Sequence, residues 1–472
     1  MGTKTRFLDH AFTLRQALGW LGMALALALL GAHFYRAGEY GITLCTAGIL
    51  LFSFARPGWK RYAVAFFILW GALEWGEAAV KLAMMRMRFG MPWLRGGAIL
   101  AVVALVTFLV GLYAYRRAKH SEPAPTAPDD AVLATKKPVV DVSGLQKTWF
   151  VQGTVFICTF LVLFYLRRGA PMNLLLLERY VPVLGSVQIF FGAWYAAFVA
   201  GKLADPRTSR KARRWIWLVF GVVFFAQFFL GIAGVGGMLL TGKLHAPVPA
   251  FIIFAPLYRE SFSMMPIIVL IATLLAGSAW CSTLCYFGPF DALAAGKGPV
   301  RPPSPLLEKA LRYGRLTVLV FGSLAAVLLG RMGLSAAQAV SITVAFAFIS
   351  LMLMAVWSRK YTSMVHCTTF CPMGLVVNVL GRLSPWRLRV DSRTCTHCGA
   401  CEKICRYRAI TPESRAQGKS LLRCTLCRDC IGGCKENAIH LSFPGMEPQR
   451  AWFVFTGLVS VLHAVFVSVA MV

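Results

Sequence analysis

The feature that most constrains the fold of this chain is a series of long apolar runs, which recurs along most of its 472 residues. A helix needs about 20 mostly apolar residues to cross the hydrocarbon core of a bilayer. Charged residues make up only 14% of the chain, compared with about 25% in soluble proteins. The sequence therefore predicts a polytopic all-α membrane protein with about 11 transmembrane helices. The predicted spans lie near residues 16–34, 40–55, 62–83, 96–115, 149–167, 180–201, 214–238, 264–280, 316–331, 338–357 and 452–472.

The net charge of +30 comes mostly from short segments between the apolar runs, where Lys and Arg set the orientation of a membrane protein. The basic segments 202–214 and 297–315 fall on one side of the membrane when these spans are counted. Basic loops favour the cytoplasm, so we expect this side to be cytoplasmic in a bacterial inner membrane. Six arginines do not fit this scheme, because they fall on the opposite side: Arg86, Arg88, Arg95, Arg167, Arg168 and Arg179. No nucleic-acid-binding motif accompanies the charge, and no nucleic-acid partner is expected.

Eight cysteines near the C-terminal end form two runs with the same C-x₂-C-x₂-C-x₃-C spacing, CTHCGACEKIC (395–405) and CTLCRDCIGGC (424–434). Three cysteines of such a run grip one iron–sulfur cubane, and the fourth ligates the neighbouring cluster. Zinc needs only four sulfur ligands, and disulfides are disfavoured on the reducing side of a membrane. The sequence therefore predicts two [4Fe-4S] clusters. The expected ligands are Cys395, Cys398, Cys401 and Cys434 for the first cluster, and Cys405, Cys424, Cys427 and Cys430 for the second.

Arg406 and Lys435 follow the fourth cysteines of the two runs, where proline is usual. Positive charge beside an anionic cluster favours its reduced state and raises its potential. The basic residues of 391–442 could dock an acidic cytoplasmic electron carrier, or they could face lipid head groups. The sequence leaves both interpretations open.

Four further cysteines form two C-x₃-C pairs, in WCSTLCYFGPFD and HCTTFCPMG, and equivalent residues of the pairs lie 86 positions apart. The pairs are Cys281 with Cys285 and Cys367 with Cys371. On a helix this spacing places both sulfurs on one face, one turn apart. Each pair follows a predicted span, which indicates an internal repeat whose two pairs face each other at the cytoplasmic rim of the bilayer. Four converging thiolates could hold a third iron–sulfur cluster or a metal ion, or they could act as redox-active dithiols.

These patterns divide the chain into five parts, because a Pro- and Ala-rich segment without periodicity follows the fourth span. The C-terminal cysteine runs form a ferredoxin-like domain, which we expect in the cytoplasm. In chain order the parts are a four-helix membrane domain at 1–115, a cytoplasmic linker at 116–148, a membrane domain with the two C-x₃-C pairs at 149–390, the 2x[4Fe-4S] ferredoxin-like domain at 391–445, and a final transmembrane helix at 446–472.

The order of spans and cysteine motifs over about residues 214–445 resembles the membrane ferredoxin-type proteins of the NapH/NosR/MauN group. That group includes the quinol-oxidising subunit linked to periplasmic nitrate reductase and the membrane protein that supports nitrous oxide reductase. The resemblance implies that the two C-x₃-C pairs correspond to the paired membrane cysteine motifs of the group. Cys285 is followed by Tyr286 where the group often has proline, and the chain has neither a covalent-flavin motif nor a large extracytoplasmic domain. The first four spans have no identified counterpart in the group.

Acidic residues inside a predicted span are costly and mark ion or proton paths. Glu74 and Glu77 share a helix face, and Lys81 follows Glu77 by four residues. A pair between Glu77 and Lys81 would satisfy both charges, so Glu74 is the candidate for proton transfer or quinone contact. His245 and Glu260, in the loop 239–263, are weaker candidates for the same role.

Haem is not expected from this sequence. There is no C-x₂-C-H motif, which excludes c-type attachment. Only His33 and His463 lie within predicted spans, at different depths, so a pair of axial ligands for b-type haem is disfavoured.

The preferred hypothesis is an electron conduit that connects the quinone pool or an extracytoplasmic redox partner, such as a reductase, with the cytoplasmic clusters. It would be a quinol dehydrogenase-like subunit, with redox proteins as partners. One alternative is a reductase that handles copper or thiols during maturation of another enzyme, which the methionine-rich segment 84–91 would suit. Another is a transporter whose iron–sulfur domain senses redox state.

Overall fold

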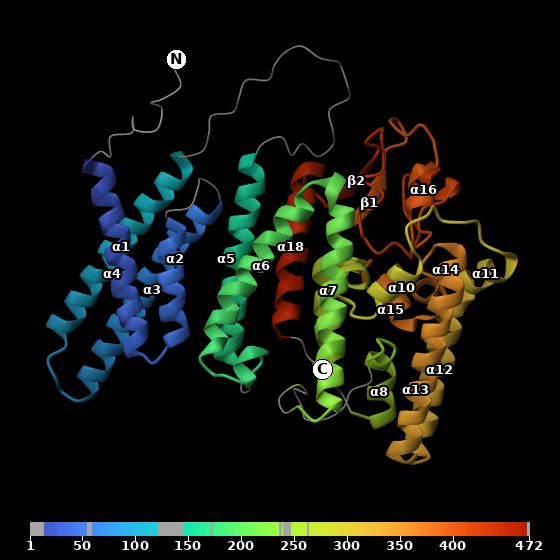
Figure 1. Cartoon of the computed structure of the whole chain (residues 1–472), viewed down its shortest axis with the longest axis horizontal. Helices are drawn as coiled ribbons and strands as arrows, with labels where there is room; N and C mark the ends of the chain where they lie inside the picture. Colours follow the sequence, from blue (N-terminus) through green and yellow to red (C-terminus); the bar gives the residue numbers. More distant parts are fainter. Residues whose placement is uncertain are drawn as a thin grey trace, which may run out of the picture. The chain divides into compact units, whose positions relative to one another are not determined.

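The computed structural model describes residues 14–53, 59–120, 145–170, 173–235, 238, 247–261 and 264–469. The chain forms two compact units (Figure 1). The first unit contains the helices up to residue 194, and the second runs from Tyr195 to the C-terminal end and includes Leu174–Leu176. The division therefore falls within the predicted membrane domain 149–390 and not at the predicted linker 116–148, of which residues 121–144 lie outside the described ones.

The first unit places a fifth helix and most of a sixth beside the four helices of the predicted front domain. Its elements are α1 (Leu14–Arg36), α2 (Tyr40–Ser53), α3 (Trp59–Arg88), α4 (Leu94–His120), α5 (Leu145–Gly169), a short 3₁₀ turn (Leu177–Arg179) and α6 (Leu184–Ala204). Aromatic side chains join α3 to α5, because Trp70 packs edge-on against Phe160 and Phe164 with ring centroids 5.3 and 5.1 Å apart. This packing explains why α5 belongs with the helices that precede the linker.

The second unit begins with the long helix α7 (Pro206–Ile232). Asp205 caps this helix by accepting the N–H of Arg207, and Pro206 occupies its first turn. The later helices are α8 (Phe251–Arg259), α9 (Met264–Ala276), α10 (Gly288–Ala294), α11 (Pro305–Lys309), α12 (Arg315–Arg331), α13 (Ala336–Met352), α14 (Arg359–Tyr361), α15 (Pro372–Leu380), α16 (Ala400–Ile404), α17 (Pro412–Ala416) and α18 (Pro448–Val469).

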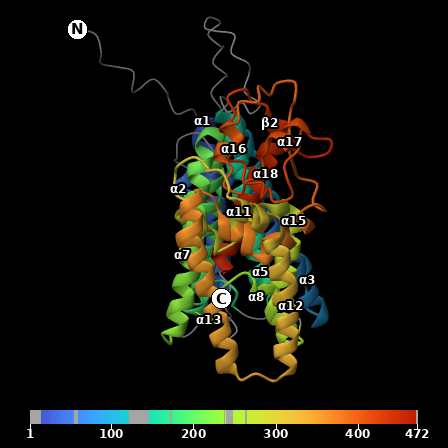
Figure 2. The same ribbon diagram turned by 90° about the vertical axis from the view of Figure 1, so that its right-hand side faces the viewer.

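Two short antiparallel strands enclose the eight-cysteine segment, β1 (Arg387–Val390) before it and β2 (Ile439–Ser442) after it. Their register pairs Leu388 with Leu441, and both side chains are buried. The strands and the cysteine segment lie at the end of the second unit where α7 and α18 begin, as Figures 1 and 2 show from two sides.

One apolar core continues from these strands into the helices. Trp386 packs edge-to-face against Phe455 of α18 with centroids 4.9 Å apart, and its indole N–H donates to the carbonyl of Leu275 at 2.9 Å. Trp452 donates in the same way to the carbonyl of Ala204 at 2.7 Å. Within the second unit the cysteine segment therefore packs against the helices and shares their apolar core.

Within the described residues, nine helices are long and apolar enough to cross a membrane, and each overlaps a predicted span. They are Trp59–Arg88, Leu94–Ala118, Thr148–Gly169, Leu184–Ala204, Pro206–Ile232, Met264–Leu284, Pro305–Arg331, Gln338–Tyr361 and Pro448–Val469. The other two predicted spans fall in α1 and α2, and the apolar part of α2 found there, Tyr40–Ile49, is short for a crossing. The chain is thus a multi-pass membrane-type protein, whereas the count of eleven and the cytoplasmic placement of the cysteine segment stay predictions.

Candidate metal centres

The two cysteine runs fold as copies of one loop. In each run the residue before the second cysteine and the residue after it have positive φ. These are His397 (54°) and Gly399 (72°) in the first run, and Leu426 (49°) and Arg428 (66°) in the second. Left-handed backbone is unfavourable for residues other than glycine, so its recurrence at equivalent positions indicates that the loop shape is imposed by what it encloses.

The first cavity, here called the outer cysteine cavity, is lined by sulfurs from both runs. Its cysteines are Cys395, Cys398, Cys401 and Cys434. The remaining lining residues are Val390, Thr396, Gly399, Ala400, Arg415, Glu436, Ala438 and Ile439.

The second cavity, here called the inner cysteine cavity, is lined by Cys405 of the first run and three cysteines of the second, Cys424, Cys427 and Cys430. The remaining lining residues are Leu388, Tyr407, Ala409, Ile410, Thr425, Arg428 and Asp429. The backbone N–H of Ala409 donates to the sulfur of Cys405 at 3.2 Å. The structure therefore brings the eight cysteines together in two groups of four, with the fourth cysteine of each run in the other group.

The two cavities differ in exposure and in the pKa of their thiols. Cys398 is exposed, and a hydrogen bond from the backbone N–H of Ala400 lowers the pKa of its thiol. In the inner cavity burial raises the pKa of Cys405 to about 11 and that of Cys427 to about 12. Binding of a metal or cluster to the inner sulfurs must therefore displace protons from thiols that hold them firmly.

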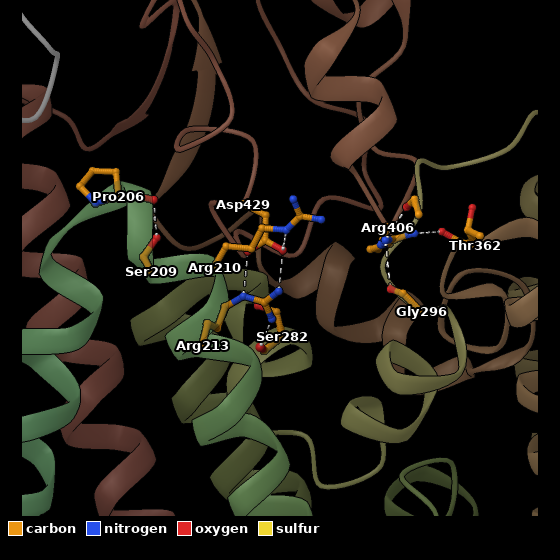
Figure 3. A network of polar contacts seen from close by, with 10 residues as sticks. Pro206, Ser209, Arg210, Arg213, Ser282, Gly296, Thr362, Arg406 and Asp429 are labelled. Atoms are coloured by element: carbon orange, nitrogen blue, oxygen red, sulfur yellow. Dashed lines mark hydrogen bonds and ion pairs between the residues drawn. The ribbon is translucent and has the colours of Figure 1, made fainter.

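A buried ion pair fixes the inner loop to the membrane helix α7, as Figure 3 shows. Arg213 donates to both carboxylate oxygens of Asp429, from Nε at 3.0 Å and from Nη2 at 2.7 Å. Its remaining nitrogen, Nη1, donates to the carbonyl of Ser282 at 2.9 Å. Arg213 thus joins the inner loop, which contains Asp429 between two cysteines, to the first C-x₃-C motif.

Arg428 fixes the same loop to α18. Its Nη1 donates to Thr456 Oγ1 at 2.7 Å, and its guanidinium lies 4.3 Å from the ring centroid of Trp452. The first run has Gly399 at the equivalent position. The backbone of Arg428 has an unfavourable φ of 66°, and its side-chain contacts with α18 offset this strain.

Arg406, one of the two residues that replace the usual proline, is a structural clamp. It is buried, and its guanidinium donates to the carbonyls of Gly296 at 3.0 Å and Gly298 at 2.7 Å, and to that of Thr362 (Figure 3). Its side chain is thereby turned towards loops of the chain itself, while Lys435 is exposed. From the sequence, Arg406 and Lys435 had the same expected role, but the first is buried and the second is exposed.

Both C-x₃-C pairs adopt the same local structure, which is a π-helical turn and not the α-helical turn that the spacing predicted. The N–H of Cys285 donates to the carbonyl of Trp280 at 2.9 Å, and that of Cys371 to the carbonyl of His366 at 3.0 Å. In each pair the second cysteine has extended backbone and ends the turn. Proline disfavours helical backbone in the residue before it, so Pro372 favours the extended Cys371 and itself begins α15. π-helical turns are rare in proteins as a whole, and those that occur are often found at functional sites.

The two turns bring the four cysteines within electrostatic range of one another. Cys281 interacts with Cys285 and Cys371, and Cys367 also interacts with these two. Arg315 of α12, which is 9% exposed, interacts with three of the four sulfurs. A buried cation beside four sulfurs would offset the negative charge of a thiolate site.

Hydrogen bonds connect this cysteine group with the inner cysteine cavity. Arg315 donates to Asn378 Oδ1 at 3.1 Å, and Asn378 Nδ2 donates to the carbonyl of Cys424 at 3.0 Å. Ser282, which lies between Cys281 and Cys285, donates from Oγ to the carbonyl of Thr425 at 2.8 Å. The first C-x₃-C turn therefore contacts the backbone of the inner loop directly.

Asp291 lies six residues after Cys285 and faces the second pair. Its Oδ2 accepts the N–H of Cys367 at 2.9 Å, and its Oδ1 accepts the hydroxyl of Ser358 at 2.6 Å. Burial raises the pKa of Asp291 to about 6 and lowers that of the neighbouring His366 to about 3. A neutral imidazole can act as a metal ligand.

Each predicted acid of α3 has a cationic partner. Glu77 pairs with Lys81 at 2.5 Å, as the sequence suggested, and both side chains are largely exposed. Glu74 is 10% exposed and lies 3.8 Å from Arg168 of α5, a partner that helical spacing could not identify. The predicted role of Glu74 in proton transfer or quinone contact stays a prediction.

Two of the arginines that do not fit the orientation scheme, Arg167 and Arg168, form ion pairs within the first unit. Arg167 contacts Glu178 at 2.6 Å and Glu39 at 3.2 Å, and Arg168 contacts Glu74.

Glu260 is not brought near the cysteines. It pairs with Arg331 at 3.7 Å at the far end of α12, and both side chains are exposed. Arg315 lies 16 residues earlier on the same helix, which corresponds to about 24 Å at 1.5 Å per residue. His245 lies outside the described residues.

The two histidines of the predicted spans are in different units and have different surroundings. His463 is fully buried, with Nε2 3.0 Å from the hydroxyl of Tyr195 and Nδ1 3.3 Å from the carbonyl of Thr283. His33 packs against Trp75 with centroids 4.6 Å apart. His463 therefore contacts the first C-x₃-C motif through Thr283, which sequence reasoning did not detect.

Sequence reasoning also missed Arg213, Asp291 and Arg315. Both arginines were counted in basic segments that orient the membrane helices, and Asp291 was quoted within a motif without a role. The available signals were separate: Arg213 and Arg315 directly precede predicted spans, and Asp291 lies six residues after Cys285. Their partners are distant in sequence, by 216 residues for Arg213 and Asp429.

Comparison with known proteins supports the iron–sulfur assignment of these motifs. A 4Fe-4S binding domain family matches residues 261–305 and 342–391, which include both C-x₃-C pairs. A second 4Fe-4S binding domain family matches residues 388–411, which include the first cysteine run. The chain therefore carries ferredoxin-type 4Fe-4S domains.

Two curated relatives match parts of the chain. An uncharacterized protein of Methanocaldococcus jannaschii, MJ0749, is 25% identical over 183 residues, which are 37% of this chain and 69% of that protein. YccM of Escherichia coli, named as a candidate electron transport protein, is 32% identical over 82 residues, or 17% of this chain and 22% of its own length. No solved structure matches the chain. The NapH/NosR/MauN resemblance stays a resemblance.

Proposed function

We propose that this protein is a membrane-bound iron–sulfur electron-transfer protein. The observation that supports this most directly is the grouping of eight cysteines around two cavities, each with four sulfurs and mostly apolar walls. The 4Fe-4S family matches and the name of YccM agree with this proposal.

The donor sets fit two [4Fe-4S] clusters, since a cubane is held by four cysteine thiolates. Cys395, Cys398, Cys401 and Cys434 would hold one cluster in the outer cavity. Cys405, Cys424, Cys427 and Cys430 would hold the other in the inner cavity. When bound, such a cluster accepts and releases one electron.

The protein itself supplies position, exclusion of water and charge. Arg213 and Arg428 hold the inner loop against α7 and α18, and Arg406 holds the segment against the loops that follow the C-x₃-C turns. Arg315 supplies positive charge beside the four membrane cysteines. These contacts favour an electron path between the C-x₃-C turns and the exposed outer cavity, by way of the inner cavity.

The finer parts of the proposal concern the two ends of this path. We place the outer cavity in the cytoplasm of a bacterial cell, open to a soluble redox partner, and the C-x₃-C turns near the membrane, open to electrons from quinol or an extracytoplasmic redox protein. The exposed Cys398 supports the first assignment. Exposed Lys435 is available to an acidic carrier, whereas Arg406 is not.

The test is a count of iron and acid-labile sulfide in the anaerobically purified full chain. Two cubanes give about eight iron atoms per chain, and Cys398→Ala should reduce this to about four. Cys158→Ala is the matched control, because Cys158 is an exposed cysteine on α5 outside both cavities. Retention of all iron in Cys398→Ala, or equal loss in Cys158→Ala, would contradict the ligand assignment.

The electron donor is tested with the same protein. Addition of a reduced quinol analogue should bleach the visible absorbance of the clusters, and this bleaching should disappear when Cys281 and Cys367 are both replaced by serine. If quinol has no effect while a copper(II) salt reoxidises chemically reduced clusters, the maturation hypothesis replaces the quinol one.

A further inference from the structure

Three side chains of different chemistry meet beside the second C-x₃-C turn. One ligand atom each from Asp291, His366 and Cys367 lie within 4.8 Å of one another. Asp291 is 0% exposed and His366 is 2% exposed. They come from separate elements, Asp291 from α10 and the other two from the π-helical turn His366–Phe370.

Both polar groups of this trio are incompletely satisfied. Nδ1 of His366 is buried and has no hydrogen-bond partner. Asp291 accepts hydrogen bonds from the hydroxyl of Ser358 and from the N–H and the thiol of Cys367, but in the part of the chain that the structure describes no arginine or lysine forms an ion pair with it. A buried carboxylate without a cation and a buried imidazole without a partner are both costly, and one bound cation would relieve both.

The trio is absent from the other half of the internal repeat. The offset of 86 residues places Trp280 opposite His366 and Val377 opposite Asp291, and both are apolar. Cys281 is the counterpart of Cys367 and lacks these two neighbours. The repeat is therefore symmetric in its cysteines and asymmetric in the polar groups around them.

The donor set restricts the kind of ion. Mg²⁺ and Ca²⁺ prefer all-oxygen sites, and Cu(I) prefers thiolates and thioethers. A mixed imidazole, thiolate and carboxylate set is suited to Zn²⁺ or Fe²⁺. Three protein ligands leave one position open for water or a further ligand.

We propose that Asp291, His366 and Cys367 bind one divalent transition-metal ion of the zinc and iron class. This site is separate from the two cysteine cavities and does not depend on the proposed electron-transfer function. Binding of the ion displaces the thiol proton of Cys367 to solvent. The rings of Phe287 and Phe370, with centroids 5.3 and 5.8 Å from that of His366, hold the imidazole in an apolar surrounding.

Co²⁺ serves as the probe, because its bond to a thiolate gives a near-ultraviolet charge-transfer band. The purified full chain is treated with a weak chelator that leaves the cluster iron in place and is then titrated with Co²⁺ under anaerobic conditions. We expect about one Co²⁺ per chain with that band, in line with a single site of three ligands. His366→Ala and Asp291→Asn should each weaken Co²⁺ binding at least tenfold.

Cys281→Ser is the matched control, because it removes the repeat counterpart of Cys367 and should leave the Co²⁺ band unchanged. Cys398→Ala should also leave it unchanged while iron is lost from the outer cavity, which separates a failure of this site from a failure of the cluster assignment. The proposal is wrong if the wild-type chain binds no Co²⁺. It is also wrong if Cys281→Ser abolishes the band while His366→Ala retains it, since the site would then consist of the four cysteines.

Discussion

The outer and inner cysteine cavities are built from the same loop and are held in different ways. The outer cavity has an exposed cysteine, a glycine at its left-handed position, and an ion pair within its own segment, from Arg415 Nη2 to Glu402 Oε1 at 2.5 Å. The inner cavity has Arg428 at the equivalent position and contacts α7 and α18 through buried arginines. The same cysteine spacing thus forms two loops that are held in different ways, and the difference comes from the residues between the cysteines.

This difference indicates that the inner loop fixes the position of its cavity, whereas the outer loop leaves its cavity accessible. The inner loop is fixed to membrane helices and to the C-x₃-C turns, so its position relative to them is set by packing. In the outer loop the carbonyl of Lys403 accepts the N–H of Val300 at 3.0 Å, and one sulfur is left accessible. A soluble partner would therefore meet the outer cavity first.

The largest effect should come from breaking the inner ion pair. Arg213→Ala leaves the buried carboxylate of Asp429 without its closest partner, which costs about 3–5 kcal/mol of stability. In a Cys398→Ala background, where only the inner cavity can hold iron, we expect iron loss at a lower denaturant concentration, followed by visible absorbance. Arg210→Ala is the control, since Arg210 lies 3.9 Å from Asp429 and is more exposed. Similar losses in the two variants would show that Arg213 does not fix the inner loop.

A smaller effect is expected at the anchor to α18. Arg428→Ala removes the hydrogen bond to Thr456 and the contact with Trp452, and should cost about 1–3 kcal/mol. The same denaturant titration measures it. Thr456→Val removes only the hydrogen-bond acceptor and should have the lesser effect of the two. If Arg428→Ala is as stable as the parent, the anchor contributes nothing and the two loops are held alike.

The smallest effect belongs to the outer loop. Gly399→Ala places a side chain at φ 72°, where nothing lies within 4 Å of the added carbon, so only backbone strain of about 1 kcal/mol is expected. A Cys427→Ala background confines iron to the outer cavity for this measurement. A loss as large as that of Arg213→Ala would mean that the outer loop is as tightly constrained as the inner one.

The parts of this molecule that depend on chain-local pattern could be predicted. Apolar runs located the helices, and the 86-residue offset identified two turns that prove to have the same hydrogen bonds. The spacing of the cysteines predicted a partition into two groups that coincides with the lining of the two cavities, while their ligation stays a prediction.

The parts that depend on distant contacts could not be predicted. Trp70 packs against α5, so α5 belongs to the first unit and the boundary between the units lies after the predicted linker. A contact of this kind leaves no local pattern in the sequence. Arg213 and Asp291 meet partners 216 and 76 residues away. The π-helical turns were not predicted either, because the spacing of the cysteines alone favours an α-helix.

The exchange of the fourth cysteines has a consequence for synthesis of the chain. Cys434 completes the outer cavity and Cys430 the inner one, so neither is whole until the ribosome has passed both runs. Of the membrane-type helices that the structure describes, only α18 is still to be made at that moment. Insertion of the proposed clusters would therefore have to wait until most of the membrane-type helices have been synthesised.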